Sequence, residues 1–303
     1  MGHLFTISDA IAVALAERRP VVALETTLVT HGLPHPEGVE AALALEAAVR
    51  EEGAIPATIG VLDGAVRVGL DRASLERLAT STDTLKLNLG NLAAHLASGR
   101  PGSTTVAATM FAAARVGIQV FATGGIGGVH RGAADSGDVS ADMTALAKYP
   151  VAVVCAGAKA ILDLPKTVEM LETLGVPVLG LGTDEFPAFY RRSSGLRVDM
   201  RCDDVAALAR AVRAHFTLAL GTGVVVANPI PAEHELAKDV YDRALATALA
   251  DAGKAGVHGR AVTPFLLERM RALTEGASVF SNRALLEHNA RMAARLAAEL
   301  VKT

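Results

Sequence analysis

The stretch Ala114-Arg-Val-Gly-Ile-Gln-Val-Phe121 decides the fold class of this chain, because a helix ends at its glycine and an apolar strand begins at once. Glu172-Thr-Leu-Gly-Val-Pro-Val-Leu179 repeats the same order farther along. Strands that alternate with helices and are apolar on both faces are typical of a parallel sheet buried between two helical layers. The sequence therefore predicts a single-domain α/β/α layered fold with a largely parallel central sheet.

The same pattern extends over the rest of the chain. We expect helices after Ser8, at 36–52, around Leu75 and at 106–116, and further helices from Glu233 onward that wrap the sheet. Apolar runs predict strands at 21–24, 55–62, 118–123, 151–155, 176–181 and 220–227, with a hairpin-like turn at Asp63-Gly64. No low-complexity linker divides the chain, so residues 1–303 are predicted to form one domain.

Composition excludes several classes of protein. Of the 303 residues, 51% are hydrophobic, and 29 basic against 32 acidic side chains leave a net charge of −3. Without a run of like charges, we expect neither a nucleic acid nor a membrane as partner. The segment 216–232 is interrupted by glycine and proline and makes a poor membrane span. Residues 1–20 lack the order of a signal peptide, and the two distant cysteines suit a reducing compartment, so we expect a cytoplasmic protein.

Two polar residues follow predicted strands, where open α/β sheets bind their ligands. Glu25 comes directly after 21–24, and partial burial there would raise its pKa toward a value useful for acid/base chemistry. It could equally pair with a cation or cap a turn. Lys159 ends the apolar run 151–158 and is either a surface amine or an amine among apolar walls, where burial favours the neutral, nucleophilic form.

The glycine-rich loop 124–132 follows another strand but lacks dinucleotide-binding spacing. It can present backbone N–H groups to a ligand, with His130 and Arg131 as donors, or it can be a tight turn in a crowded sheet. Asp135, Asp138 and Asp142 follow it and offer oxygen ligands suited to Mg²⁺ or Mn²⁺. Asp138 could also cap a helix that starts at this point.

The segment 101–109 carries glycine and hydroxyl residues into an alanine-rich helix. Free N–H groups at such a helix start can hold a phosphate, to which Lys86 could add a cation, although an ordinary cap has the same composition. His31 and His35 flank a Gly32 and Pro34 turn, which makes a zinc pair improbable. A P-loop and a Gly-x-Ser-x-Gly motif are both absent from the sequence.

Taken together, these motifs resemble those of pseudouridine-5′-phosphate glycosidases, the family that includes the indigoidine-cluster A proteins. The resemblance is carried, in family order, by Ala23-Leu-Glu-Thr-Thr27, His31-Gly-Leu-Pro34, Thr104-Thr-Val-Ala107, Phe121-Ala-Thr-Gly-Gly-Ile-Gly-Gly-Val-His-Arg-Gly132, Asp138-Val-Ser-Ala-Asp142, Val153-Val-Cys-Ala-Gly-Ala-Lys-Ala-Ile-Leu-Asp163, Pro187-Ala-Phe-Tyr190, Val226-Ala-Asn-Pro-Ile-Pro231 and Thr263-Pro-Phe-Leu-Leu267. It covers nearly the whole chain.

The resemblance implies an enzyme that reversibly cleaves the C–C glycosidic bond of pseudouridine 5′-phosphate, giving uracil and ribose 5-phosphate. It also implies one Mn²⁺ per subunit and a homotrimer. By the same resemblance, Glu25 is the general acid/base and Lys159 the amine that attacks C1′ and forms a Schiff base. Asp138 is implied to hold the Mn²⁺, largely through waters.

The substrate contacts implied in this way come from several segments: Lys86, Thr105, the N–H of Val106, His130, Ser140, Ala141, Asp142 and Asn282. One departure stands out, because the family follows its lysine with a Ser-x-Arg-Asp-like stretch and this chain has Leu87-Asn-Leu-Gly-Asn-Leu92 after Lys86. Two alternatives therefore stay open. The substrate could be another phosphorylated sugar or C-nucleoside, or the chain could be a phosphate-binding protein of a pigment cluster without activity.

Overall fold

The computed structural model describes residues 4–257 and 262–302. Its main sheet is parallel and runs in the order β3, β2, β7, β8, β11, β9, β10. These strands are β2 (Val21–Leu24), β3 (Ile55–Leu62), β7 (Val120–Ala122), β8 (Ala152–Cys155), β9 (Val178–Leu181), β10 (Met200–Cys202) and β11 (Val224–Ala227). From β2 the chain passes to β3 on one side and later returns to β7 on the other, so the strand order reverses at the gap between the ends of β2 and β7.

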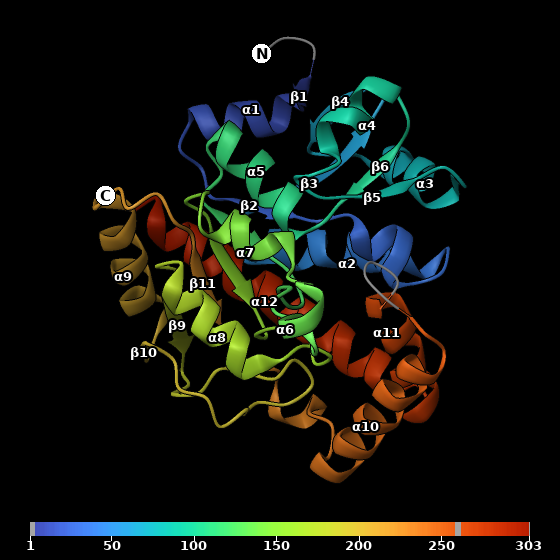
Figure 1. The fold of residues 1–303 in the computed structure, drawn as a ribbon. Coiled ribbons are helices and arrows are strands. Elements are labelled where there is room, and N and C mark those ends of the chain that lie inside the picture. The colour runs from blue at the N-terminus through green and yellow to red at the C-terminus, as the bar shows by residue number, and fades with distance from the viewer. Residues whose placement is uncertain (1–3, 258–261, 303) are drawn as a thin grey trace.

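Helices cover both faces of this sheet (Figure 1). Behind it lies α12 (Ala277–Leu300), which packs on β2, β7 and β8 between α2 (Glu37–Glu51) and α9 (Val205–Thr217). In front lie α5 (Val106–Val116), α7 (Ala141–Leu146) and α8 (Leu164–Thr173). The remaining helices are α1 (Asp9–Ala16), α3 (Arg72–Thr80), α4 (Leu92–Ser98), α6 (Ala133–Ser136), α10 (Lys238–Lys254) and α11 (Val262–Leu273), with a π-helical turn η1 (Leu28–Gly32) and a 3-10 turn η2 (Ala232–His234).

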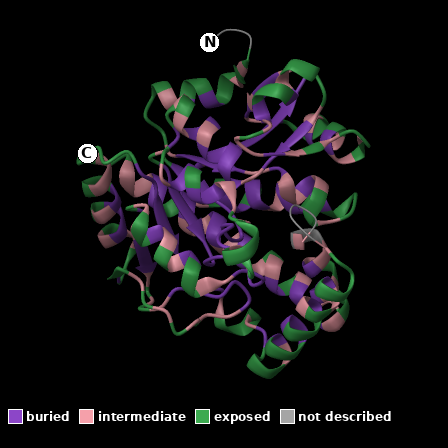
Figure 2. Ribbon diagram, in the orientation of Figure 1, coloured by how far each residue is buried: buried purple, intermediate pink, exposed green. Residues whose placement is uncertain are grey.

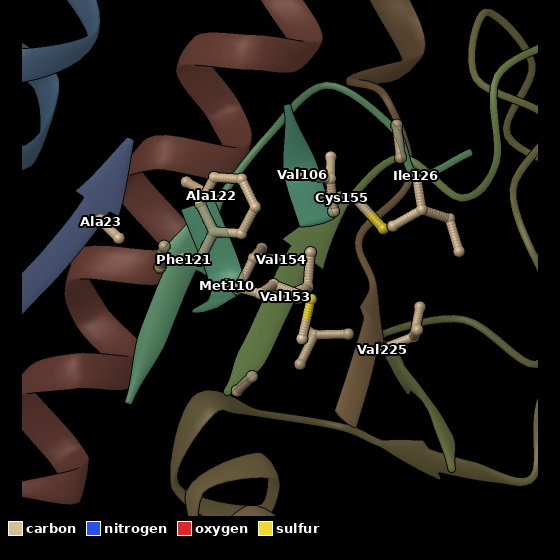
Figure 3. Packing of buried hydrophobic residues seen from close by; sticks show 14 of the residues in the cluster. Ala23, Val106, Met110, Phe121, Ala122, Ile126, Val153, Val154, Cys155 and Val225 are labelled. Atoms are coloured by element: carbon tan, nitrogen blue, oxygen red, sulfur yellow. The ribbon is translucent and has the colours of Figure 1, made fainter. Parts of the chain in front are cut away.

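The core lies between these layers. Figure 2 shows the central strands buried and the outward faces of the helices exposed. Phe121, Val153 and Val225 from neighbouring strands are fully buried and contribute to one hydrophobic cluster (Figure 3). None of the described helices is long and apolar enough to cross a lipid bilayer. The α/β/α fold with a largely parallel sheet is thus confirmed. The prediction of one domain over residues 1–303 stays a prediction, because residues 1–3, 258–261 and 303 lie outside the described residues.

A second, mixed group of strands branches from β3. The second half of β3 pairs antiparallel with β4 (Ala65–Val68) through the predicted turn, in which Asp63 and Gly64 both have positive φ. It also pairs antiparallel with β6 (Gly102–Thr104), and β5 (Leu85–Leu87) and β1 (Phe5–Ile7) extend this group. The sequence did not predict β1, β5, β6 or β10, because runs of three residues carry no readable periodicity.

Candidate active site

Glu25 and Thr123 meet across the gap where the strand order reverses. Glu25 follows β2, Thr123 follows β7, and the Thr123 hydroxyl donates to Glu25 Oε1 at 2.5 Å. Burial raises the pKa of Glu25 above its ordinary value; Asp142 adds to this shift, whereas Lys159, the Thr123 hydroxyl and Lys86 oppose it. The predicted direction of this pKa shift is therefore confirmed.

Lys159 stands on a backbone turn that requires glycine. Gly157 has φ of +82°, and a Cβ at that position would lie 2.0 Å from the carbonyl oxygen of Pro187. The backbone then pairs with the glycine-rich loop in both directions, because Ile126 N–H donates to Gly157 O and Lys159 N–H donates to Ile126 O, each at 3.0 Å. Within the described residues Lys159 forms no ion pair, so its amine is not committed to a carboxylate.

One cavity joins these groups. Its empty space, with the open mouth included, is about 600 Å³, and it is lined by Glu25, Thr27, Leu28, His31, Gly32, Lys86, Thr123, Gly124, Gly125, Lys159, Phe189, Leu267, Asn282 and Leu286. Four residues singled out from sequence thus line one cavity: Glu25, Lys86, Lys159 and Asn282. His31 also lines it, bonded through Nδ1 to the Thr30 hydroxyl at 2.6 Å, whereas His35 pairs with Glu76 outside it.

Lys86 is partly buried beside the other charged groups. Burial lowers its pKa, nearby Lys159 lowers it further, and Glu25 and Asp142 work in the opposite direction. Lys86 is half-buried and lines the cavity. The divergent segment that follows folds into an asparagine turn, in which Asn91 donates to Lys86 O and Asn88 accepts from the N–H of Gly90.

The start of α5 lies next to this cavity without lining it. Thr105 caps the helix by accepting from the N–H of Ala108 at 3.5 Å, and Asp142 Oδ1 accepts from the N–H of Ala107 at 2.9 Å. Within residues 4–257 and 262–302 the N–H of Val106 has no acceptor. One free N–H at a helix N-terminus is therefore present where the sequence predicted phosphate binding.

Asp142 has a second partner that the sequence did not indicate. Its Oδ2 accepts from the N–H of Gly127 at 2.8 Å, so both carboxylate oxygens bind backbone donors. Asp142 thereby ties the glycine-rich loop to α5. Its negative charge raises the pKa of both Glu25 and Lys86, which lie nearby. The neighbouring Ser140 caps α7 and Ala141 is its first residue, so the cap that the sequence allowed for Asp138 belongs to Ser140 instead.

The glycine-rich loop is a tight turn rather than a row of free donors. Its N–H groups at Ile126, Gly127 and Val129 donate to Gly157 O, Asp142 Oδ2 and Thr167 Oγ1, respectively. A Cβ on Gly127 would lie 2.2 Å from the Ser140 hydroxyl oxygen. The glycines therefore serve close packing, and the structural alternative stated from sequence holds for these three N–H groups.

Asp138 and His130 lie at the end of this loop. Burial lowers the pKa of His130, Lys159 and Lys86 lower it further, and Asp138 counteracts them, so the loop lies close to the lysines. The Asp138 carboxylate accepts no hydrogen bond from any described residue. Within the same ranges, no three His, Cys, Asp or Glu side chains assemble as a possible metal site, and Asp135 is exposed. The Asp138 carboxylate therefore fits an ion that keeps most of its waters and takes one carboxylate from the protein.

Sequence reasoning missed the residues that support Glu25. Thr123 was noted only as part of a motif, and Asn289 was not singled out at all. Asn289 lies in the middle of α12, fully buried, and its amide bonds Thr123 O at 2.8 Å. A polar residue on the apolar face of a long helix is the signal that could have found it.

Comparison with known proteins places the chain in a family. The family model described as "Indigoidine synthase A like protein" matches residues 10–299. The chain belongs to this family. Among its relatives, a protein of Paracoccus denitrificans named pseudouridine-5′-phosphate glycosidase is 54% identical over 302 residues, which cover 99% of each chain. A protein of the same name from Caldanaerobacter subterraneus is 50% identical, covering 100% of this chain and 98% of its own.

Two solved structures share the fold. The prealnumycin C-glycosynthase AlnA in complex with ribulose 5-phosphate superposes with a TM-score of 0.92 at 41% identity, covering 99% of this chain and 98% of its own. An indigoidine synthase A-like protein from Thermotoga maritima gives a TM-score of 0.86 at 37% identity, covering 94% of each chain.

Proposed function

We propose that this chain catalyses the reversible cleavage of the C–C glycosidic bond of pseudouridine 5′-phosphate to uracil and ribose 5-phosphate. The observation that carries the proposal is one cavity lined by a carboxyl group with a raised pKa, Glu25, and an amine without an ion-pair partner among the described residues, Lys159. Relatives that are half identical over the full length carry the name of this activity.

The chemistry explains why an amine is needed. A nitrogen-linked base can be expelled after protonation, but here C1′ is bonded to carbon. In the proposed first step Glu25 gives a proton to the ribose ring oxygen as the neutral amine of Lys159 attacks C1′, so the C1′–N bond forms and the C1′–O bond breaks. The nitrogen loses a proton, and its lone pair then forms the C=N bond while C1′–C5 breaks and C5 of uracil takes a proton. Water adds to the resulting Schiff base, which releases ribose 5-phosphate and the free amine.

The remaining predicted residues surround this centre. Lys86 contributes a cation and Val106 a free N–H for the phosphate, while Asn282 and His130 are assigned to the rest of the substrate. We propose that Thr105, Ser140, Ala141 and Asp142 shape this side of the pocket. Asp138 would hold a Mn²⁺ ion, which when bound supplies positive charge that offsets the phosphate.

A second candidate substrate is another phosphorylated sugar. Two observations favour it: Leu87 to Leu92 replaces the family's Ser-x-Arg-Asp-like stretch beside Lys86, and the structural neighbour AlnA is a C-glycosynthase in complex with ribulose 5-phosphate. A panel of pseudouridine 5′-phosphate, ribulose 5-phosphate and ribose 5-phosphate with added uracil separates the two. A higher kcat/KM on ribulose 5-phosphate than on pseudouridine 5′-phosphate supports the second candidate, whereas turnover of ribose 5-phosphate with uracil is the reverse of the first reaction.

The test of the proposed function has two parts. Purified protein is incubated with pseudouridine 5′-phosphate and Mn²⁺, and uracil release is followed by chromatography. Borohydride reduction in the presence of ribose 5-phosphate should then add the sugar mass to the tryptic peptide that contains Lys159. Lys159→Ala should lose both signals, whereas Lys86→Met should keep the label and weaken binding. Binding of ribose 5-phosphate with no turnover, unchanged in Lys159→Ala, would support a phosphate-binding protein instead.

We also propose that the protein is a cytoplasmic homotrimer, as the family resemblance implies. Sedimentation velocity of the purified chain tests the assembly, with a single species at three times the 31.2 kDa chain mass as the expected result. A single species at the mass of one chain would contradict it.

A further inference from the structure

The strongest unassigned feature is a buried polar chain that ends on Glu25. Asn228, at the end of β11, donates through Nδ2 to Asn289 Oδ1 at 2.8 Å, and Asn289 donates through Nδ2 to Thr123 O at 2.8 Å. The Thr123 hydroxyl then donates to Glu25 Oε1. Four elements meet in this way: β2, β7 and β11 at their carboxyl ends, and α12 from behind the sheet (Figure 1).

Burial makes these bonds obligatory. Thr123 and Asn228 are each 2% exposed and Asn289 is 0% exposed, so water cannot replace a lost partner. The direction of the chain follows from chemistry, because a carbonyl oxygen only accepts. Thr123 O must face the NH₂ group of Asn289, which leaves Asn289 Oδ1 for the amide of Asn228.

The backbone of Thr123 is held on both sides. Its N–H donates to Val154 O at 3.1 Å, and its C=O accepts from Asn289. Threonine is branched at Cβ and has few rotamers, so a fixed backbone fixes the direction of its hydroxyl. That hydroxyl donates to Oε1 of Glu25. The other carboxyl oxygen, Oε2, has no hydrogen-bond partner among the described residues and remains accessible to solvent.

We propose that Thr123, held by Asn289, is the positioning residue for Glu25: its hydroxyl fixes one carboxyl oxygen and turns the other toward the cavity. This rests on the proposed function only in the role given to Glu25. Thr123 touches the carboxyl group, and this proposal gives it no part in making or breaking a substrate bond. The charged groups that face Glu25 are Lys159, Asp142 and Lys86, and none of them donates a hydrogen bond to it.

Thr123→Val removes the hydroxyl at nearly constant shape. The hydroxyl stabilises the ionised carboxylate, so its loss should raise the pKa of Glu25 further. The inflection of the kcat/KM profile that belongs to Glu25 should move to higher pH by roughly one unit, whether Glu25 acts as acid or base. kcat should fall about tenfold or more, with a smaller change in KM, because orientation matters most in the transition state. Thr123→Ser should restore both the inflection and the rate.

Thr58→Val is the matched control. Thr58 lies on β3, is buried, and its hydroxyl donates to the buried carboxylate of Glu46 at 2.6 Å, away from the cavity. It should lose stability but keep the wild-type pH profile. If Thr123→Val does not fold, judged by circular dichroism, Thr123→Ala takes its place.

A readout without substrate separates this proposal from the proposed function. Carbon-13 NMR titration of labelled glutamate, with Glu25 assigned through Glu25→Gln, measures the carboxyl pKa directly. A higher pKa in Thr123→Val supports the positioning role even if pseudouridine 5′-phosphate is not turned over. An unchanged pKa and an unchanged kcat/KM inflection in Thr123→Val overturn it, and so does an equal shift in Thr58→Val.

Discussion

Gly157→Ala should destabilise the fold and the active site together, because Gly157 combines two constraints. Its φ of +82° lies in the left-handed region, which costs an alanine about 1–2 kcal/mol. Its Cβ would also lie 2.0 Å from Pro187 O, and a backbone oxygen cannot turn away as a side chain can. Overpacking of this kind costs about 1–3 kcal/mol, so the free energy of unfolding should fall by about 2–5 kcal/mol.

Gly175→Ala isolates the first constraint. Gly175 has φ of +68°, and a Cβ there would meet nothing within 4 Å. This variant should lose only the cost of the left-handed backbone, about 1–2 kcal/mol. Urea unfolding followed by far-UV circular dichroism measures both losses.

The activity should separate the two variants further. Pro187 is two residues from Phe189, whose N–H donates to Ala156 O at 2.9 Å and whose ring lines the cavity. Relief of the clash must move either this wall or the turn that carries Lys159. Gly157→Ala should therefore lose most of its kcat under conditions where it is still folded, and Gly175→Ala should keep it. Equal losses of stability and activity in the two variants would refute the reasoning from close contact.

Three further predictions follow from single side chains. Glu25→Gln should raise the free energy of unfolding at pH 7.5 but not below pH 4.5. The folded-state pKa of Glu25 lies above its ordinary value of 4.5, so ionisation of this carboxyl destabilises the fold as pH rises from 4.5 through the folded-state pKa. Urea unfolding at both pH values measures this, and a gain independent of pH would contradict it. Asp142→Asn leaves one of two backbone N–H donors facing an amide NH₂ group, which should cost about 1–3 kcal/mol of unfolding free energy and lower turnover, while exposed Asp135→Asn should change neither. Burial raises the pKa of the Cys155 thiol to about 12 and also raises that of buried Cys202, so a thiol reagent at pH 8 should label neither in the folded protein and both in urea; rapid labelling of the folded protein would contradict the burial.

The part of the site that sequence could predict is the part fixed by strand ends. Glu25 and Lys159 follow β2 and β8, and parallel strands in one sheet present their carboxyl ends at the same edge. Both are therefore brought to one cavity although 134 positions, 159 minus 25, separate them in the chain. The bounds of α5 at Val106 and Val116 could also be predicted, because a capping threonine and a terminal glycine mark them.

The part that sequence could not predict depends on pairing between distant segments. Ser103 and Thr104 belong to the hydroxyl-rich segment 101–109, for which the sequence predicted phosphate binding at the helix start. Because β6 pairs with β3, Thr104 donates to Ile59 O at 2.6 Å and Ser103 accepts from the Thr30 hydroxyl at 2.8 Å, so both hydroxyls are used inside the protein. Composition indicates a hydroxyl-rich helix start but not which strand will lie beside it. The two backbone partners of Asp142 escaped prediction for the same reason, since they lie 35 and 15 residues away in the chain.

The position of Glu25 follows from topology as well as from its own strand. The chain leaves β2 toward β3 on one side and returns to β7 on the other, so the strand order reverses at the gap between the ends of β2 and β7. The Glu25 to Thr123 hydrogen bond crosses this gap, and Asn289 supports it from α12 on the far side of the sheet. An open gap lets a substrate reach the carboxyl group, yet an open gap alone would leave that group free to rotate. A hydroxyl from the opposite strand, fixed by a fully buried amide, supplies the missing restraint without closing the cavity.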